Sequence, residues 1–130
     1  MPYKVEFSEK PFGLITKFFG VVTDDELRQS CIDRTSSDEQ IKKLAYILDD
    51  FSDVSDFAVT SEAVINAASF AVKASELNNN IKFLSIMPTD LLYGMTRMWH
   101  AYTDETQWER NIVRTREEAE QWMKNNGFKN

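Results

Sequence analysis

The chain has 130 residues, which suits a single domain covering residues 1–130. Hydrophobic residues make up 42% of it and aromatic residues 12%, so it can bury a substantial core, and intrinsic disorder is excluded as the main interpretation. Acidic residues outnumber basic ones by 21 to 15, and the formal net charge of −6 argues against nucleic acid or an anionic membrane surface as the partner.

The cysteine content and the first residues of the chain predict a cytoplasmic location. Cys31 is the single cysteine, so no intramolecular disulfide can form. The sequence after Met1 lacks the basic and apolar regions of a secretory signal. The most continuous apolar stretch, 57–74, is interrupted by Glu62 and Lys73, so we expect no membrane insertion.

Two strands joined as a hairpin are predicted at the start of the chain. Residues 3–7 alternate between apolar and polar with period two, as in an edge strand with one buried face. Pro11 and Gly13 then mark a turn, and residues 14–19 form the second strand. Gly20 is expected to end that strand.

A helix and a central strand are predicted next. The helix begins at the capping box 23–26, and the polar segment 35–40 either closes it or opens one further short turn. Residues 44–48 are apolar without alternation, which is typical of a strand covered on both faces. The acidic segment 49–56 that follows is expected to be a solvated loop.

The second half of the chain repeats the alternation of helix and strand. Small apolar residues at spacings of three and four predict a helix from Thr60 or Ser61 to Leu77, with a face that allows close approach to a sheet. Residues 81–87 resemble the central strand, and a helix from 89 to about 102 follows them.

The last strand and helix complete the predicted fold. Residues 110–114 form a short strand, and a second capping box at Thr115 opens a helix that Gly127 ends. Alternating strands and helices require a largely parallel sheet. We therefore predict an α/β fold with a mixed five-stranded sheet, in which only the N-terminal hairpin is antiparallel, and about four helices.

The acidic segment contains the densest group of potential metal ligands. Asp49, Asp50 and Asp53 follow the central strand, at the end of the sheet where open α/β folds usually bind ligands. Magnesium would need these carboxylates to converge, so we prefer a solvated acidic segment. His100 is the single histidine, and with one cysteine it argues against zinc. No metal and no cofactor are predicted.

The helix over residues 89–102 has two faces that could bind a ligand. One stripe could form an anion site or simply an exposed face, and it carries Tyr93, Arg97, His100 and Asp104. The other side could be core, line an apolar pocket or form a homodimer interface, and it carries Leu91, Leu92, Met95, Met98, Trp99 and Tyr102. The ligand-binding candidates are Tyr93, Arg97, Met98, Trp99, His100 and Tyr102.

Four segments, together with the order of elements, carry a resemblance to a known family. The segments 43–49 and 81–86 each precede a helix, and residues 93–98 and 113–122 include the last strand and the start of the last helix. These features resemble the bacterial SpoIIAA-like family, which is related to STAS domains, with residues 93–98 and 113–122 similar to its closing strand and its "eeA..W" helix. The resemblance spans nearly the whole chain and implies a STAS-like fold.

The resemblance also implies two kinds of site. In phospho-regulated STAS proteins, an Asp-Ser-Ser-Gly turn presents a phosphoacceptor serine at the start of a helix. Here the region reads Ala-Val-Thr-Ser-Glu over residues 58–62, so Thr60 and Ser61 are the phosphoacceptor candidates, although capping alone also explains them. The SpoIIAA-like group is also similar to the lipid-binding CRAL-TRIO fold, which implies an apolar ligand.

No catalytic residues are assigned. The sequence has only four glycines, no GxSxG turn and no glycine-rich phosphate loop. An enzyme with a site around Asp49, Asp50, Arg97 and His100 is the least favoured interpretation. We favour a non-catalytic STAS-like regulatory or protein-interaction domain. The alternative is a small carrier or sensor that binds an apolar or lipid-like ligand between the helix 89–102 and the sheet.

Overall fold

Five strands and five α-helices lie along residues 2–128, which are the residues that the computed structural model describes. In chain order they are β1 (Tyr3–Glu9), β2 (Phe12–Thr23), α1 (Asp24–Arg34), α2 (Asp38–Lys43), β3 (Tyr46–Ala58), α3 (Ser61–Leu77), β4 (Lys82–Ile86), α4 (Asp90–Ala101), the 3-10 turn η1 (Asp104–Thr106), β5 (Glu109–Val113) and α5 (Arg116–Asn125).

The strands pair in the order β1-β2-β3-β4-β5, with β1 antiparallel to β2 and the other neighbours parallel. The predicted α/β class and the mixed five-stranded sheet are confirmed. About four helices were predicted, and the structure has α2 in addition. It forms because the Ser37 hydroxyl caps its first turn by accepting a hydrogen bond from the backbone N–H of Gln40 at 3.3 Å.

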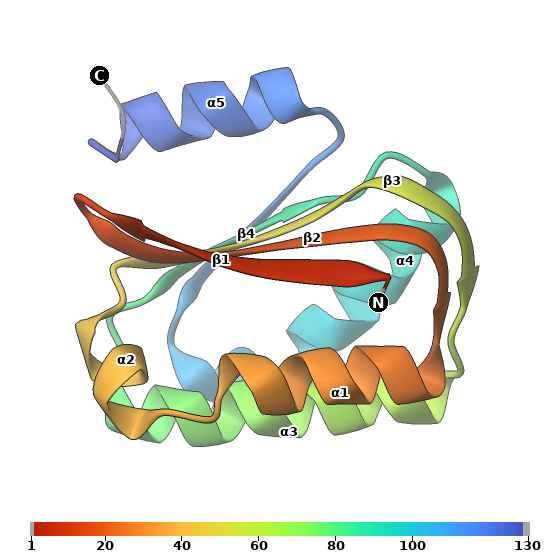
Figure 1. Cartoon of the computed structure of the whole chain (residues 1–130), viewed down its shortest axis with the longest axis horizontal. Coiled ribbons are helices and arrows are strands. Elements are labelled where there is room, and N and C mark those ends of the chain that lie inside the picture. The colour runs from red at the N-terminus through yellow and green to blue at the C-terminus, as the bar shows by residue number, and fades with distance from the viewer. Residues whose placement is uncertain (1, 129–130) are drawn as a thin grey trace.

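Helices α1, α2, α3 and α4 cover one face of the sheet, and α5 covers the other (Figure 1). This layering follows from the strand order. From β2 to β5 each parallel strand is added on the same side, so crossovers of one hand place all their helices on one face. Helix α5 follows the last strand and packs on the opposite face, near β4 and β5.

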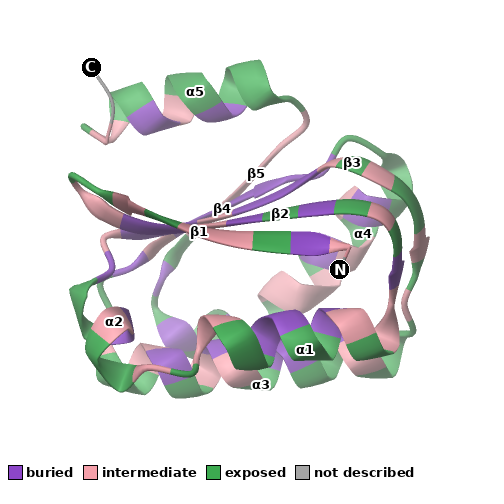
Figure 2. Cartoon of the chain, in the orientation of Figure 1, coloured by how far each residue is buried: buried purple, intermediate pink, exposed green. Residues whose placement is uncertain are grey.

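The hydrophobic core lies mainly between the sheet and the four helices α1 to α4 that cover one of its faces (Figure 2). Phe18 of β2 stacks on Phe51 of β3 with 4.3 Å between ring centroids. A smaller cluster lies under α5 and consists of Leu84, Ile86 and Ala119. Two buried layers therefore enclose the middle strands, which explains their continuous apolar sequences.

Two strands extend well beyond their predicted ends. Strand β2 continues past Gly20 to Thr23, because Gly20 adopts a φ of +67° and absorbs a shift of register instead of ending the strand. Strand β3 continues to Ala58, so the prediction of a loop over 49–56 is wrong. The two extensions pair with each other, which satisfies their backbone hydrogen-bonding groups while the acidic side chains at Asp53 and Asp56 stay exposed.

A glycine is required where β2 passes Tyr46. A Cβ atom at Gly13 would lie 2.1 Å from Cζ of the Tyr46 ring. The ring is held there by a 2.6 Å hydrogen bond between its hydroxyl and that of Ser8, and by stacking on Phe128 at 5.0 Å between centroids. This contact links the hairpin to the C-terminal segment.

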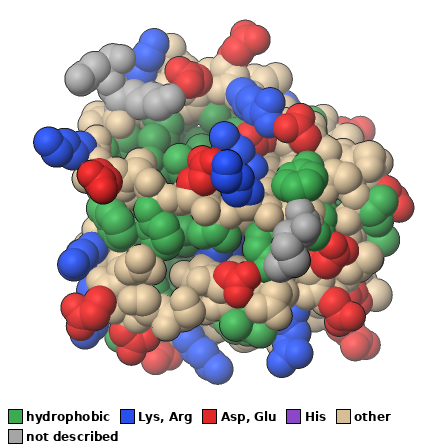
Figure 3. All heavy atoms as spheres, in the orientation of Figure 1, with side chains coloured by type: hydrophobic (Ala, Val, Ile, Leu, Met, Phe, Trp, Pro, Cys, Tyr) green, Lys and Arg blue, Asp and Glu red, His purple; other side chains and the backbone are tan. Residues whose placement is uncertain are grey.

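Acidic and basic side chains are interspersed over the face of the molecule that Figure 3 shows, with patches of apolar side chains between them. No helix within residues 2–128 combines the length and the apolar character needed to cross a membrane.

Candidate ligand-binding cavity

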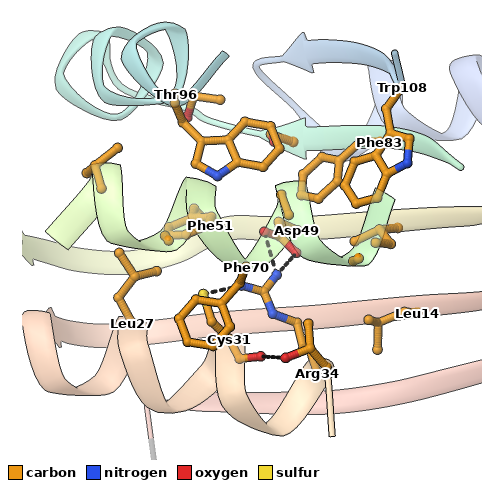
Figure 4. A pocket seen from close by; sticks show the side chains of 18 of the residues that line it. Leu14, Leu27, Cys31, Arg34, Asp49, Phe51, Phe70, Phe83, Thr96 and Trp108 are labelled. Atoms are coloured by element: carbon orange, nitrogen blue, oxygen red, sulfur yellow. Dashed lines mark hydrogen bonds and ion pairs between the residues drawn. The ribbon is translucent and has the colours of Figure 1, made fainter. Parts of the chain in front are cut away.

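A cavity of about 100 Å³ lies between the sheet and helices α1, α3 and α4 (Figure 4). Most of its lining is apolar, from Leu14 and Phe51 on the strands to Leu27 and Phe70 on the helices. Trp108, just before β5, also lines it. The cavity therefore occupies the interior layer in which most of the core lies.

Small residues on α3 leave the space for this cavity. Ala67, Ala71 and Ala74 are buried and line it. The sequence predicted that this face would allow close approach to the sheet, but the nearest neighbours of α3 are α1 and α4. Because the alanines project little toward the strands, the gap between α3 and the sheet stays partly unfilled.

A row of polar side chains crosses the sheet beneath the cavity. Thr16, Asp49 and Ser85 are in register on β2, β3 and β4, and all three are buried. The Thr16 hydroxyl has no hydrogen-bond partner within residues 2–128. Ser85 lines the cavity, and its hydroxyl likewise bonds to no other residue of that range. Buried hydroxyl groups normally have a hydrogen-bond partner.

Arg34, at the end of α1, reaches across the cavity to Asp49 (Figure 4). Its Nη1 donates to both carboxylate oxygens, at 2.7 and 2.8 Å. Its Nε donates to the carbonyl of Ser30 at 3.2 Å, and its Nη2 lies 3.4 Å from Sγ of Cys31. Both side chains of the pair are 11% exposed, so this is a largely desolvated ion pair.

Burial and pairing act on the pKa values of these groups in opposite directions. Burial raises the pKa of the Asp49 carboxyl above its usual range, and the guanidinium of Arg34 opposes this rise. Burial lowers the pKa of Arg34, but the neighbouring carboxylate outweighs it, so the pKa of Arg34 stays above its usual value. Burial also raises the pKa of the Cys31 thiol, which is therefore neutral.

A second hollow, of about 240 Å³, lies on the other face beneath α5. It is larger, but its walls include the exposed charged side chains of Lys17, Arg116 and Glu120. Such walls are readily solvated, so the hollow does not need a ligand to fill it. The interior cavity, with apolar walls and a buried polar row, is the better candidate for ligand binding.

Comparison with known proteins gives the fold. No family model matches the chain, and no curated protein matches it in sequence. A structure of the anti-sigma factor antagonist SpoIIAA in its unphosphorylated form has a TM-score of 0.62 at 11% identity, covering 94% of this chain and 97% of SpoIIAA. The chain has a SpoIIAA-like fold.

Two further solved structures share the SpoIIAA-like fold. One is the phosphorylated form of SpoIIAA from Bacillus, with a TM-score of 0.56 and 14% identity over 93% of this chain and 98% of that one. The other is an uncharacterized protein of the DUF3478 family from Shewanella loihica PV-4, with a TM-score of 0.53 and 20% identity over 92% and 90%. At these identities the likeness concerns the fold alone.

The phosphoacceptor candidates lie at the start of α3 in the SpoIIAA-like fold. The hydroxyl of Thr60 caps the helix, accepting from the backbone N–H of Ala63 at 3.2 Å. The same hydroxyl donates to Asp24 at 2.8 Å, and the backbone N–H of Thr60 donates to the other carboxylate oxygen at 2.7 Å. Ser61 is exposed. Phosphorylation of either residue stays a prediction.

Of the six predicted ligand-binding residues, Trp99 lines the cavity, and its ring lies 4.7 Å from that of Phe83. The other five are not part of the lining. The guanidinium carbon of Arg114 lies 4.4 Å from the centroid of the Tyr93 ring, and Arg97 and Tyr102 are exposed. Four residues of α4 line the cavity: Leu92, Met95, Thr96 and Trp99. Three of them belong to the apolar side of the helix named from the sequence, whereas Thr96 was not predicted.

His100 lies outside the cavity, at the junction of α4 with β5. Its backbone carbonyl accepts a hydrogen bond from Arg110, which also bonds the hydroxyl of Thr103 at 2.8 Å and Asp104 at 2.9 Å. Burial, with a further contribution from Arg110, lowers the pKa of His100 to about 4. The imidazole is therefore neutral near pH 7, and its Nε2 has no partner within the described residues.

The three aspartates proposed as potential metal ligands do not converge. Asp49 points into the cavity, whereas Asp50, the next residue of the strand, points to the opposite face and pairs with Arg116 at 2.9 Å. Asp53 pairs with the same arginine at 2.8 Å. Within residues 2–128 no group of three or more histidine, cysteine or acidic side chains is arranged to hold a metal ion.

Sequence reasoning named Asp49 but missed its partner and the polar row. One signal was present in the sequence. Ile47, Asp49 and Phe51 fall on one face of a strand, so a charged side chain had to occupy a buried position. Such a charge requires a partner of opposite sign. Arg34 could be identified as that partner only once the position of α1 over β3 was known.

Proposed function

We propose that the protein binds a small apolar or amphipathic molecule in the interior cavity, as a carrier or sensor. The observation that carries this proposal is a cavity of about 100 Å³ whose apolar lining surrounds one desolvated ion pair. Protein interiors contain few voids larger than a water molecule. Space that no side chain fills leaves the residues around it with fewer packing partners, and a ligand that filled it would restore such contacts.

The size of the cavity suits a molecule of about one ring. An apolar cavity of about 150 Å³ in another protein stays dry and binds benzene. The present cavity is of the same order, and its walls include the flexible side chain of Met95 and two tryptophans, Trp99 and Trp108. Side chains that can move allow modest expansion around a ligand.

Benzene is a suitable first probe of this function. We expect benzene at ten times its dissociation constant to raise the free energy of unfolding by about 1.4 kcal/mol, measured by urea unfolding in sealed cells. Ala71→Leu should fill part of the cavity and weaken this stabilisation. Ala101→Leu places the same side chain on an exposed position outside the cavity and serves as the matched control. An unchanged free energy of unfolding at saturating benzene would contradict the proposal.

A native ligand can be sought without guessing its identity. Native mass spectrometry of protein from its own host should show an added mass that is lost on denaturation, and Trp99→Ala should reduce the retained fraction because Trp99 lines the cavity.

A non-catalytic regulatory domain that binds a protein partner is the second candidate function. It is supported by the SpoIIAA-like fold, since the matched SpoIIAA structures are of an anti-sigma factor antagonist in unphosphorylated and phosphorylated forms. It is also supported by the exposed position of Ser61 at the start of α3. A phosphoryl mass that survives denaturation and disappears in Ser61→Ala, but not in Ser55→Ala, would support this candidate. A bare chain would count against phospho-regulation.

A further inference from the structure

The interior cavity has one polar region, and its charges balance. Arg34 and Asp49 are the charged residues of the lining, and they pair with each other. A ligand with a charged head would enter this desolvated space without a counter-ion, and burying an unpaired charge is strongly unfavourable. The charge balance therefore favours a neutral ligand.

The same region has hydrogen-bonding capacity that the protein does not use. Ser85 lies beside Asp49 on the neighbouring strand, in register with it, and its hydroxyl has no hydrogen-bond partner within residues 2–128. Within the same residues, the Nη2 group of Arg34 donates to Sγ of Cys31 alone, at 3.4 Å, and sulfur is a weak acceptor. The carboxylate of Asp49 receives two contacts from Arg34, although it offers about four lone-pair positions.

A single hydroxyl group fits this set of donors and acceptors. It can donate to an oxygen of Asp49 or Ser85 and accept from Nη2 of Arg34 or from Ser85. A wholly apolar ligand would leave the Ser85 hydroxyl and the remaining hydrogen-bonding positions of Arg34 and Asp49 unused in a largely buried site, which is unfavourable. A molecule with several polar groups would bring some of them against the apolar walls formed by Phe51, Phe70 and Phe83.

We infer that the ligand of this cavity is a small neutral alcohol or phenol, with its apolar body among the aromatic side chains and its hydroxyl between Asp49 and Ser85. This inference rests on the proposed ligand-binding function and specifies the chemical class of the ligand. It assigns Ser85 and Arg34 as the residues that recognise the polar group.

The inference can be tested with three probes that share one ring: benzene, phenol and benzoate. A purely apolar cavity would prefer benzene, because phenol must give up its hydrogen bonds to water. We expect the opposite order here, with phenol binding about tenfold more tightly than benzene and benzoate binding more weakly than phenol. Binding would be measured by isothermal titration calorimetry at pH 7, where phenol is neutral.

Ser85→Ala should reduce the preference for phenol over benzene to about threefold or less, since one hydrogen bond is removed while the ring contacts remain. Ser75→Ala is the matched control, because Ser75 is a partly buried serine outside the lining. It should leave the preference unchanged. The order of the three probes on the unaltered protein is a test that does not depend on the folding of any variant.

The outcomes separate this inference from the proposed function. If benzene binds as tightly as phenol, or benzoate binds most tightly, the hydroxyl class is refuted while the cavity remains a binding site. An unchanged phenol preference in Ser85→Ala would refute the role of Ser85. If none of the three probes binds, both the inference and the proposed function fail.

Discussion

Replacing Arg34 and Asp49, singly and together, tests how the buried ion pair in the cavity affects stability. Asp49→Leu leaves a guanidinium without its counter-ion in a site where the side chain is 11% exposed. Breaking a buried pair from one side costs about 3–5 kcal/mol. We therefore expect Asp49→Leu to lower the free energy of unfolding by about that amount, a large part of the roughly 5–15 kcal/mol typical of a domain.

The partner substitution, Arg34→Met, should have an effect that depends on pH. It leaves Asp49 buried, and burial already raises the pKa of that carboxyl. Without the opposing guanidinium the folded-state pKa rises further, so the folded protein takes up a proton more readily than the unfolded chain. A protonated Asp49 therefore contributes to the free energy of unfolding. This contribution is fully present below the pKa of Asp49 in the unfolded chain, about 3.9, and is lost as the pH rises through the raised pKa of the folded state.

The two single variants are therefore distinguishable. Arg34→Met should be less destabilised, relative to the unaltered protein, at pH 5 than at pH 8. The cost of Asp49→Leu should change little over this range, because a guanidinium does not lose its proton. Urea unfolding followed by circular dichroism at both pH values measures these differences.

The double variant Arg34→Met/Asp49→Leu completes the cycle. Apolar residues in place of a buried ion pair are often neutral or stabilising, so the double variant should be more stable than either single variant at pH 8. The reasoning would be refuted if the double variant were as unstable as the worse single one, or if Asp49→Leu cost less than about 1 kcal/mol.

Three further predictions concern parts of the fold outside the cavity. Gly13→Ala should cost about 1–3 kcal/mol in urea unfolding, because its Cβ would overlap the Tyr46 ring. Gly94→Ala should instead stabilise by about 0.5–1 kcal/mol, since this position in α4 has open space around it. An NMR titration should give His100 a pKa of about 4. Because that value is depressed, stability should fall as the pH drops from 6.5 toward 4, by about 1–2 kcal/mol after allowance for partial exposure; a pKa near 6.5 would contradict this.

Local patterns were sufficient to predict most of the secondary structure. The spacing of alanines predicted a helix from Thr60 or Ser61 to Leu77, and α3 runs from Ser61 to Leu77 with Thr60 as its N-cap. Both capping boxes form as expected, with the backbone N–H of Thr23 donating to Glu26 at 3.1 Å and that of Thr115 donating to Glu118 at 3.2 Å. These features depend on residues at most four positions apart, so a single sequence contains all of the information.

The extended strands depend on partners distant in sequence. Asp53 and Asp56 indicated a loop because acidic residues are rare in strands. In the structure Asp53 pairs in register with Phe19, and Asp56 with Val21. Each extension supplies the backbone hydrogen bonds of the other, so neither could be predicted from its own composition. The same reason explains why Arg34 was not identified as the partner of Asp49.

The strongest argument for function in this fold is that two unfavourable features coincide. A void in the core lowers stability. A buried ion pair is also weak evidence for stability, since apolar side chains in its place would often serve at least as well. Here Arg34 and Asp49 pair within the cavity itself, and Ser85, whose hydroxyl has no partner within residues 2–128, lines it. Natural proteins accept such local costs mainly where they serve activity or binding, so their coincidence favours a site shaped for a ligand over an accident of packing.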